Sequence, residues 1–133
     1  MKACYLDASA LVKLATPEAE TDALRTVLEA YDARVTNRLA TVEVTRALLR
    51  RGVASAGLVE AVAEAFTGLA IMELDPATAD SAGRIGPSTL RSLDAIHLAS
   101  ALALGAELGS MVTYDSRLAD AARASGLAVV APA

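Results

Sequence analysis

The sequence is short of the residues that would fix a fold covalently or place it in a membrane. Among 133 residues there is one cysteine, Cys4, so no disulfide can form within the chain. Together with a single histidine, this shortage excludes a zinc site built from histidine and cysteine. No apolar run is long enough to span a bilayer, and no signal-peptide core precedes Asp7. We therefore expect a protein of the reducing cytoplasm.

Aromatic residues are also scarce, at 3% of the chain, whereas apolar residues make up 54%. Alanine, leucine and valine must therefore supply the core, and the length predicts one domain over residues 1–133. The net charge of −4 argues against attraction of a polyanion by bulk charge. Five arginines are nevertheless clustered: Arg34, Arg38, Arg46, Arg50 and Arg51. A solvated helix face explains them, and contact with phosphates is the alternative.

Apolar runs alternate with amphipathic stretches from one end of the chain to the other. Short runs typical of buried parallel strands lie at 3–6, 34–36, 69–74, 110–113 and 127–130. Helical periodicity, caps and breakers indicate helices at 7–14, 18–31, 39–51, 55–66, 75–85, 92–104 and 116–124. Strands that alternate with helices predict the α/β class, with a parallel sheet covered by helices on both faces.

Four acids lie where such a fold would bring them together. Asp7 and Asp115 follow predicted strands, whereas Glu43 and Asp94 lie on predicted helices. Parallel sheets bind their ligands beyond the carboxyl ends of the strands, near a switch in strand order. Carboxylates from separate segments suit a hard divalent ion such as Mg²⁺. We therefore predict that these four acids form a metal site at this edge of the sheet.

Each acid also has a simpler explanation. Asp7 and Asp115 could only cap the helices that follow them. Asp94 could only complement the positive end of its helix. Glu43 could pair with Arg46 on the same helix, although a surface pair of about 0.5 kcal/mol would not justify an acid near the core. The metal site is the one hypothesis that accounts for all four acids.

Four further side chains lie near the acids in sequence. Ser9 and Thr113 could position a water molecule or a phosphate, although local hydrogen bonding explains Ser9 and an ordinary strand position explains Thr113. Arg91, just before Asp94, could contact a phosphate. His97, one helical turn after Asp94, could act as an acid or a base, but its apolar neighbours favour a histidine packed in the core.

Four segments carry a family resemblance. They are Tyr-Leu-Asp-Ala-Ser-Ala-Leu-Val-Lys-Leu at 5–14, Thr-Val-Glu-Val-Thr-Arg-Ala-Leu at 41–48, Leu-Asp-Ala-Ile-His-Leu-Ala at 93–99 and Val-Thr-Tyr-Asp-Ser-Arg-Leu at 112–118. In this order and spacing, the chain resembles the PIN-domain nucleases and, within them, the VapC-type toxins of bacterial toxin–antitoxin pairs. The resemblance covers essentially the whole chain. It makes Asp7, Glu43, Asp94 and Asp115 the acids of four successive motifs.

The resemblance implies a three-layer α/β/α fold with a five-stranded parallel sheet. It also implies a Mg²⁺- or Mn²⁺-dependent endoribonuclease, an RNA substrate, an antitoxin that blocks the site, and a homodimer. The apolar faces of the helices at 18–31 and 55–66 could then contact the antitoxin or a second copy, although ordinary core packing explains them. The nucleophile would be water rather than the RNA 2′-hydroxyl, so the products would carry 5′-phosphate and 3′-hydroxyl ends.

Other functions remain open on the sequence. A PIN-type nuclease could process RNA without an antitoxin, and a domain that binds metal without catalysis would carry the same acids. A phosphatase that uses Asp7 as its nucleophile, or a signal receiver, fits less well. The phosphatase chemistry commonly needs a second acid where this chain has Ser9. Both classes need a late lysine, whereas no lysine follows Lys13.

Overall fold

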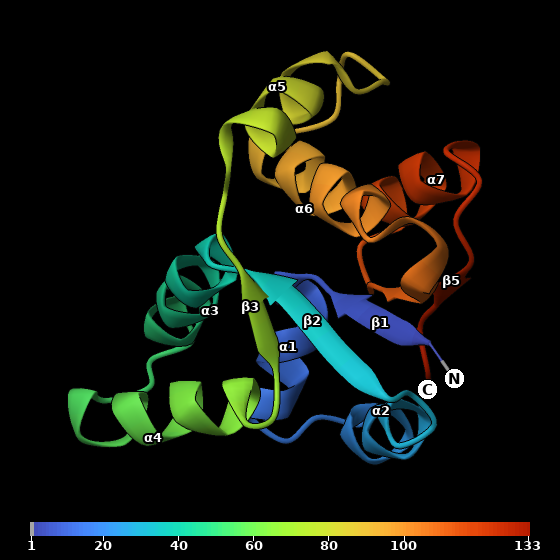
Figure 1. Ribbon diagram of the computed structural model, residues 1–133. Coiled ribbons are helices and arrows are strands. Elements are labelled where there is room, and N and C mark those ends of the chain that lie inside the picture. Colours follow the sequence, from blue (N-terminus) through green and yellow to red (C-terminus); the bar gives the residue numbers. More distant parts are fainter. Residues whose placement is uncertain (1) are drawn as a thin grey trace.

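The computed structural model describes residues 2–133 and contains a sheet of five parallel strands (Figure 1). In chain order the strands are β1 (Ala3–Leu6), β2 (Ala33–Asn37), β3 (Ala70–Met72), β4 (Leu108–Val112) and β5 (Val129–Val130). Across the sheet their order is β3-β2-β1-β4-β5, and each neighbouring pair is parallel. The prediction of a five-stranded parallel sheet is therefore confirmed.

Helices cover both faces of this sheet. They are α1 (Ala8–Ala15), α2 (Thr21–Leu28), α3 (Leu39–Arg50), α4 (Ser55–Phe66), α5 (Pro76–Arg84), α6 (Ser92–Ala103) and α7 (Ser116–Ala124), and a 3₁₀ turn at Gly105–Glu107 precedes β4. Figure 1 shows α1 to α4 on one side of the strands and α5 to α7 on the other. This is the predicted three-layer α/β/α arrangement. Within residues 2–133, no helix has the length and apolar character needed to cross a membrane.

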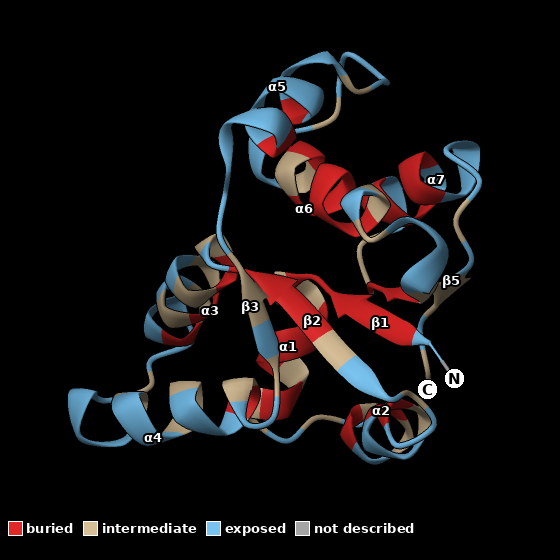
Figure 2. Ribbon diagram, in the orientation of Figure 1, coloured by how far each residue is buried: buried red, intermediate tan, exposed pale blue. Residues whose placement is uncertain are grey.

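The central strand β1 contributes to two cores through alternate side chains. Cys4 and Leu6 belong to the core shared with α1 to α4, whereas Tyr5 packs in the core shared with α6 and α7. All four residues of β1 are buried, and Figure 2 shows the strand enclosed by the buried faces of its neighbours. A strand that is buried on both faces needs a continuous apolar run, which is why its sequence lacks alternation.

The largest difference from the predicted elements is at the helix expected over 18–31, which begins at Thr21 and ends at Leu28. The Thr21 hydroxyl donates to the carbonyl of Lys13 and accepts from the N–H of Glu18, so the preceding residues form a turn between α1 and α2. The strand expected over 69–74 is also shorter, because only Ala70–Met72 pair with β2 at the sheet edge. The periodicity of apolar residues contains no information about such hydrogen bonds. It therefore overestimates the lengths of this helix and this strand.

The connections create a switch point beside β1. From β1 the chain runs to β2 and β3 on one side, whereas β4 and β5 lie on the other side. Asp7 follows β1 directly, and its N–H donates to the carbonyl of Val112, the last residue of β4, at 3.3 Å. Thr113 follows β4 directly. The carboxyl edge between these two strands is the position where parallel sheets usually bind ligands.

Candidate active site

Asp7 lies where β1 passes into α1, and it is 3% exposed. Its Oδ1 accepts from the N–H of Ala10 at 3.1 Å, which confirms the capping interaction. Oδ1 also accepts from the Ser9 hydroxyl at 2.7 Å, and Oδ2 accepts from the Thr113 hydroxyl at 2.7 Å. Burial nevertheless raises the pKa of Asp7 above its ordinary value, because the hydrogen bonds only partly offset desolvation. Helix capping alone does not explain why a carboxylate is buried at this position.

Ser9 and Thr113 connect the ends of β1 and β4 around Asp7. Their hydroxyl oxygens lie 3.3 Å apart. Ser9 Oγ accepts from the N–H of Tyr114 at 2.9 Å, and Thr113 Oγ1 accepts from the N–H of Asp115 at 3.1 Å. Each hydroxyl has a single proton, and both protons are directed at Asp7. The two residues therefore orient Asp7, and the contact with water or phosphate predicted for them would use their oxygen lone pairs.

Asp115 and Asp94 approach from the other helical layer. Asp115 Oδ1 caps α7 by accepting from two backbone N–H groups of the first turn, at 2.9 and 3.1 Å, which confirms its capping role. Asp94 is half-buried in the first turn of α6. Burial raises the pKa of Asp94, and the negative charges of Asp115, Asp7 and Glu43 raise it further. The other three predicted acids therefore lie within electrostatic reach of Asp94.

Glu43 reaches this region from α3 and contacts α6. Its Oε1 lies 2.5 Å from Nε2 of His97, and Nδ1 of His97 lies 2.7 Å from the Tyr5 hydroxyl. His97 is 1% exposed, so it is a core histidine as the sequence favoured. No ion pair between Glu43 and Arg46 is formed among residues 2–133, and the alternative explanation of Glu43 is therefore wrong.

Tyr5 is the residue in this region that the sequence analysis missed. It appeared only as an apolar position in a buried strand. A buried tyrosine hydroxyl and a buried histidine both need hydrogen-bond partners, and that requirement is the one signal that could have paired them. The sequence contains no indication of which partners they would find.

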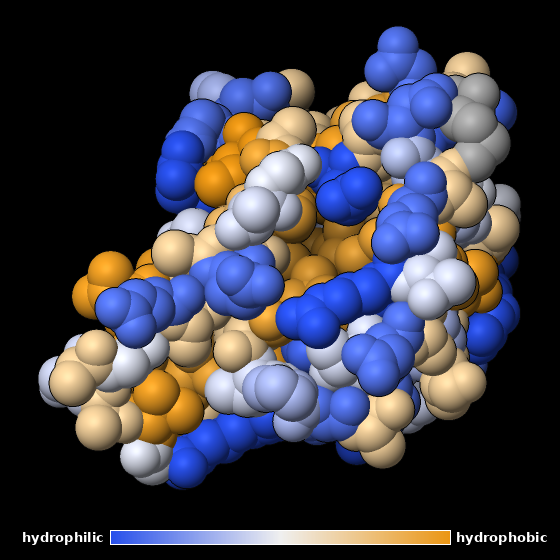
Figure 3. All heavy atoms as spheres, turned by 90° about the horizontal axis from the view of Figure 1, so that it is seen from below, coloured by the Kyte–Doolittle hydropathy of each residue, from blue (hydrophilic) through white to orange (hydrophobic). Residues whose placement is uncertain are grey.

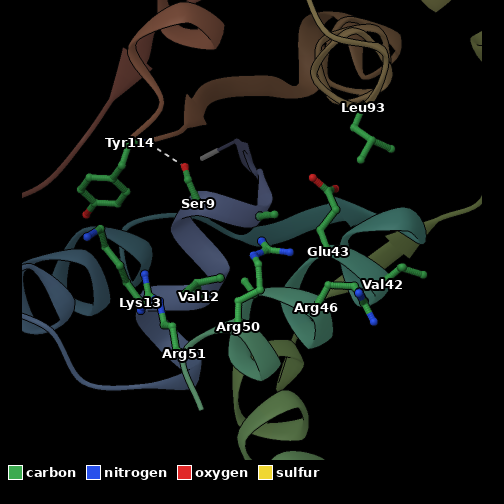
Figure 4. A pocket seen from close by; sticks show the side chains of 12 residues that line it. Ser9, Val12, Lys13, Val42, Glu43, Arg46, Arg50, Arg51, Leu93 and Tyr114 are labelled. Atoms are coloured by element: carbon green, nitrogen blue, oxygen red, sulfur yellow. Dashed lines mark hydrogen bonds between the residues drawn. The ribbon is translucent and has the colours of Figure 1, made fainter. Parts of the chain in front are cut away.

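Two cavities flank the carboxylates. The first has a volume of about 530 Å³ and is bordered by Ser9 and Glu43, with basic side chains of α1 and α3 around it (Figure 4). The second has a volume of about 830 Å³ and is lined by Asp94, with Arg91 and Arg117 beside it. Glu43 and Asp94 therefore each border a hollow that has basic residues in its walls.

The four carboxylates fit a hard divalent cation by their chemistry. Mg²⁺ and Mn²⁺ prefer oxygen ligands, and a cation would offset the unfavourable charge that the raised pKa values of Asp7 and Asp94 record. Within residues 2–133, no three His, Cys, Asp or Glu side chains are already arranged to hold one ion. Mg²⁺ usually keeps several waters and needs only one or two carboxylates, so this spacing does not oppose the assignment.

A family model described as PIN domain matches residues 4–124. The chain belongs to the PIN-domain family. This PIN domain is 48% identical over 132 residues to the ribonuclease VapC46 of Mycobacterium tuberculosis, with 99% of each chain covered. It is 42% identical over 132 residues to the ribonuclease VapC47 of the same species, with 96% of each chain covered.

A solved structure shares the architecture of this PIN domain. The crystal structure of VapC20 from M. tuberculosis, a toxin that cleaves the sarcin–ricin loop, aligns with a TM-score of 0.74. The alignment covers 97% of this chain and 99% of VapC20, at 18% sequence identity. At that identity the likeness shows the fold alone. The PIN-domain match itself spans all four acidic motifs.

Proposed function

We propose that this PIN domain is a metal-dependent endoribonuclease that acts as the toxin of a type II toxin–antitoxin pair. The observation that carries the proposal is that Asp7, which follows β1 at the switch point of the sheet, Glu43 and Asp115 all lie within electrostatic reach of Asp94. Its chemical class is supported by the 48% identity to a protein named ribonuclease VapC46. Carboxylates favour hydrolysis by a water that a bound cation activates. The Ser9 hydroxyl is engaged with Asp7, Thr113 and the N–H of Tyr114.

Asp7 and Asp94 are the proposed direct ligands of Mg²⁺ or Mn²⁺. Such a cation supplies polarisation of a phosphoryl oxygen and a lower pKa of a bound water. Glu43 and Asp115 would complete the site by holding a second ion or by orienting water toward the phosphorus. Ser9 and Thr113 support this arrangement, because their hydrogen bonds fix both oxygens of the Asp7 carboxylate.

Four arginines near the acids form no ion pair among residues 2–133, and they support a path for the RNA across the acids. On the first cavity, Arg46 and Arg50 project from α3 one turn apart, on the face that also carries Glu43 (Figure 4). Neither forms an ion pair among residues 2–133, whereas the Lys13 and Arg51 of that cavity pair with acids of the α1–α2 turn.

The second cavity continues this path. Arg91 and Arg117 line it beside Asp94, and neither is ion-paired within residues 2–133. An RNA strand with its scissile phosphate at the acids would place its flanking phosphates within reach of both arginine pairs. This route uses local positive charge on a chain whose net charge is negative.

The toxin role requires an inhibitor, which we propose is a VapB-like antitoxin. Val42 and Leu93 line the first cavity and are 59% and 44% exposed, so a protein could bury them. A segment bound there would also lie over Glu43 and block the site. On the side of α2 and α4, hydrophobic atoms are also exposed between hydrophilic side chains (Figure 3). A homodimer, a cytoplasmic location and a single domain over residues 1–133 belong to the same proposal.

Cleavage of a labelled RNA by the purified chain tests the enzymatic part. We expect cleavage in Mg²⁺ or Mn²⁺, loss of cleavage in excess EDTA, recovery when the cation is restored, and 5′-phosphate and 3′-hydroxyl ends. Full activity in excess EDTA, or 2′,3′-cyclic phosphate ends, would contradict the mechanism. A chain that binds Mn²⁺ but cuts no RNA would instead be a metal-binding interaction domain.

Co-expression with the product of the neighbouring small gene tests the toxin part. A stable complex in which cleavage is suppressed is the expected result. If no such gene or no inhibition is found while cleavage persists, the chain is a PIN-type RNA-processing nuclease that works without an antitoxin.

A further inference from the structure

A chain of polar contacts runs from the centre of the sheet to the acids. It begins at the Tyr5 hydroxyl, passes through both ring nitrogens of His97, and ends at Glu43 Oε1, with distances of 2.7 and 2.5 Å. Tyr5 is 0% exposed and His97 is 1% exposed, so water does not compete for these contacts. The Tyr5 and His97 rings also meet edge to face, with centroids 5.7 Å apart and planes at 63°.

The chemistry of the three groups sets the direction of each hydrogen bond. An ionised carboxylate can only accept, so Nε2 of His97 must donate to Glu43. Burial raises the pKa of Tyr5 well above its ordinary value, so the phenol keeps its proton and can donate. In a neutral imidazole, Nδ1 then accepts from Tyr5. The Tyr5 hydroxyl therefore gives Nδ1 a hydrogen-bond partner in the tautomer that directs the Nε2–H at Glu43.

Glu43 depends on this contact more than the two capping acids depend on any one of theirs. Asp7 and Asp115 are held by backbone N–H groups of their own helices. Glu43 lies in the middle of α3, where the backbone N–H groups are already used, and a free glutamate would sample several rotamers. The bond from His97 occupies Oε1, and no hydrogen bond occupies Oε2 among residues 2–133.

We propose that Tyr5 and His97 are positioning residues, which hold the Glu43 carboxylate in the orientation that binds the divalent cation. The inference rests on the proposed function, because it takes Glu43 as one of the cation ligands. It assigns a role to two buried side chains that touch neither the RNA nor the cation. In metal sites, loss of such an outer hydrogen bond costs about 10- to 100-fold in metal affinity or activity.

The test compares wild type with four variants. Calorimetry gives the Mn²⁺ dissociation constant of each protein. Nitrogen NMR of the metal-free proteins that retain His97 gives the imidazole tautomer without ambiguity, because the chain has one histidine. Tyr5→Phe removes only the hydroxyl, His97→Gln has an amide that can still donate to Glu43, and His97→Leu has no donor. Tyr31→Phe is the matched control, since Tyr31 packs in the opposite core with α1 to α4.

We expect the wild-type ring to be in the Nε2–H form. Tyr5→Phe should leave Nδ1 of His97 without its donor, loosen the ring and weaken Mn²⁺ binding by about 10-fold or more, with kcat reduced and KM little changed. His97→Gln should retain more of the affinity than His97→Leu does. Tyr31→Phe should match wild type in both measurements.

Several results would overturn the inference. They are an Nδ1–H tautomer in wild type, wild-type Mn²⁺ affinity in Tyr5→Phe, and equal affinities in His97→Gln and His97→Leu. If wild type binds no Mn²⁺ yet cleaves RNA, this inference fails and ribonuclease activity stands. If Mn²⁺ binding depends on Tyr5 and His97 but no RNA is cut, the inference stands and the proposed function fails.

Discussion

Asp94 carries a charge that the folded chain disfavours. Burial and three neighbouring carboxylates raise its pKa above the ordinary value. An acid whose pKa is higher in the folded than in the unfolded chain destabilises the fold when it is ionised, and this cost disappears as the pH falls below both pKa values. A neutral side chain at position 94 would therefore be better for stability alone, and the proposed role of Asp94 as a cation ligand would explain the carboxylate.

We expect Asp94→Asn to separate stability from activity. The amide removes the charge with little change in shape, so the unfolding temperature of the metal-free protein should stay the same or rise. RNA cleavage should fall by about 100-fold or more, because charge stabilisation at a metal site is worth several kcal/mol. Thermal unfolding and single-turnover cleavage give the two values. The exposed Asp22→Asn is the control, and wild-type cleavage by Asp94→Asn would exclude Asp94 from the site.

At the scale of elements, α5 and α7 both begin with a capping aspartate, but the two helices lie at different positions relative to the sheet. Asp75 caps α5 by accepting from the N–H of Thr78 at 2.7 Å, and Asp115 caps α7. Asp75 is exposed and does not raise the pKa of Asp94, whereas Asp115 does. The local sequence signals are equivalent, and only the position of each helix relative to the sheet distinguishes them.

This pair allows the capping and catalytic roles to be tested together. Asp115→Ala should lose about 1 kcal/mol of unfolding free energy, and Asp75→Ala should also be less stable than wild type, because each helix loses its cap. Asp115→Asn should keep most of that stability, since asparagine caps as well as aspartate does. Only the two Asp115 variants should lose cleavage. Urea unfolding and RNA cleavage supply the measurements, and full activity in Asp115→Asn would reduce Asp115 to a cap.

Most element positions could be predicted from sequence because their signals are local. Asp75-Pro76 marks the start of α5, and the uninterrupted apolar run at 3–6 marks a strand buried on both faces. The turn before Thr21 could not be predicted, because it depends on a hydrogen bond to the carbonyl of Lys13 in another helix. Predicted element boundaries are wrong where such tertiary hydrogen bonds replace local ones.

At the scale of the whole molecule, the sheet concentrates negative charge at one edge, and a bound cation should stabilise the fold. At a cation concentration of 100 Kd the expected gain is about 2.7 kcal/mol, or roughly 5 to 15 °C in the unfolding temperature of a domain this size. Thermal scans with increasing Mn²⁺ measure it. Asp94→Asn should show a much smaller shift, and an equal shift in both proteins would place the ion elsewhere.

Cys4 offers a second measurement of global stability. It is 0% exposed in the central strand, and burial raises the pKa of its thiol from 9.0 to about 11. The thiolate is the reactive form, so alkylation at pH 8 should be slow and should require global unfolding. Mn²⁺ should slow it further. An added exposed cysteine, as in Asp22→Cys, should react at once, and equally fast labelling of Cys4 would show that β1 opens locally.

The sequence by itself determined the α/β class, the alternation of elements and the identity of the four acids. Periodicity, caps and residue chemistry are local properties, and the acidic motifs add a family resemblance. Only the tertiary structure decided that Asp94 lies within reach of Asp7, Glu43 and Asp115, because strand order brings distant segments to one edge. It also decided that Tyr5 and His97 meet, since a buried polar group takes whichever partner the packing supplies.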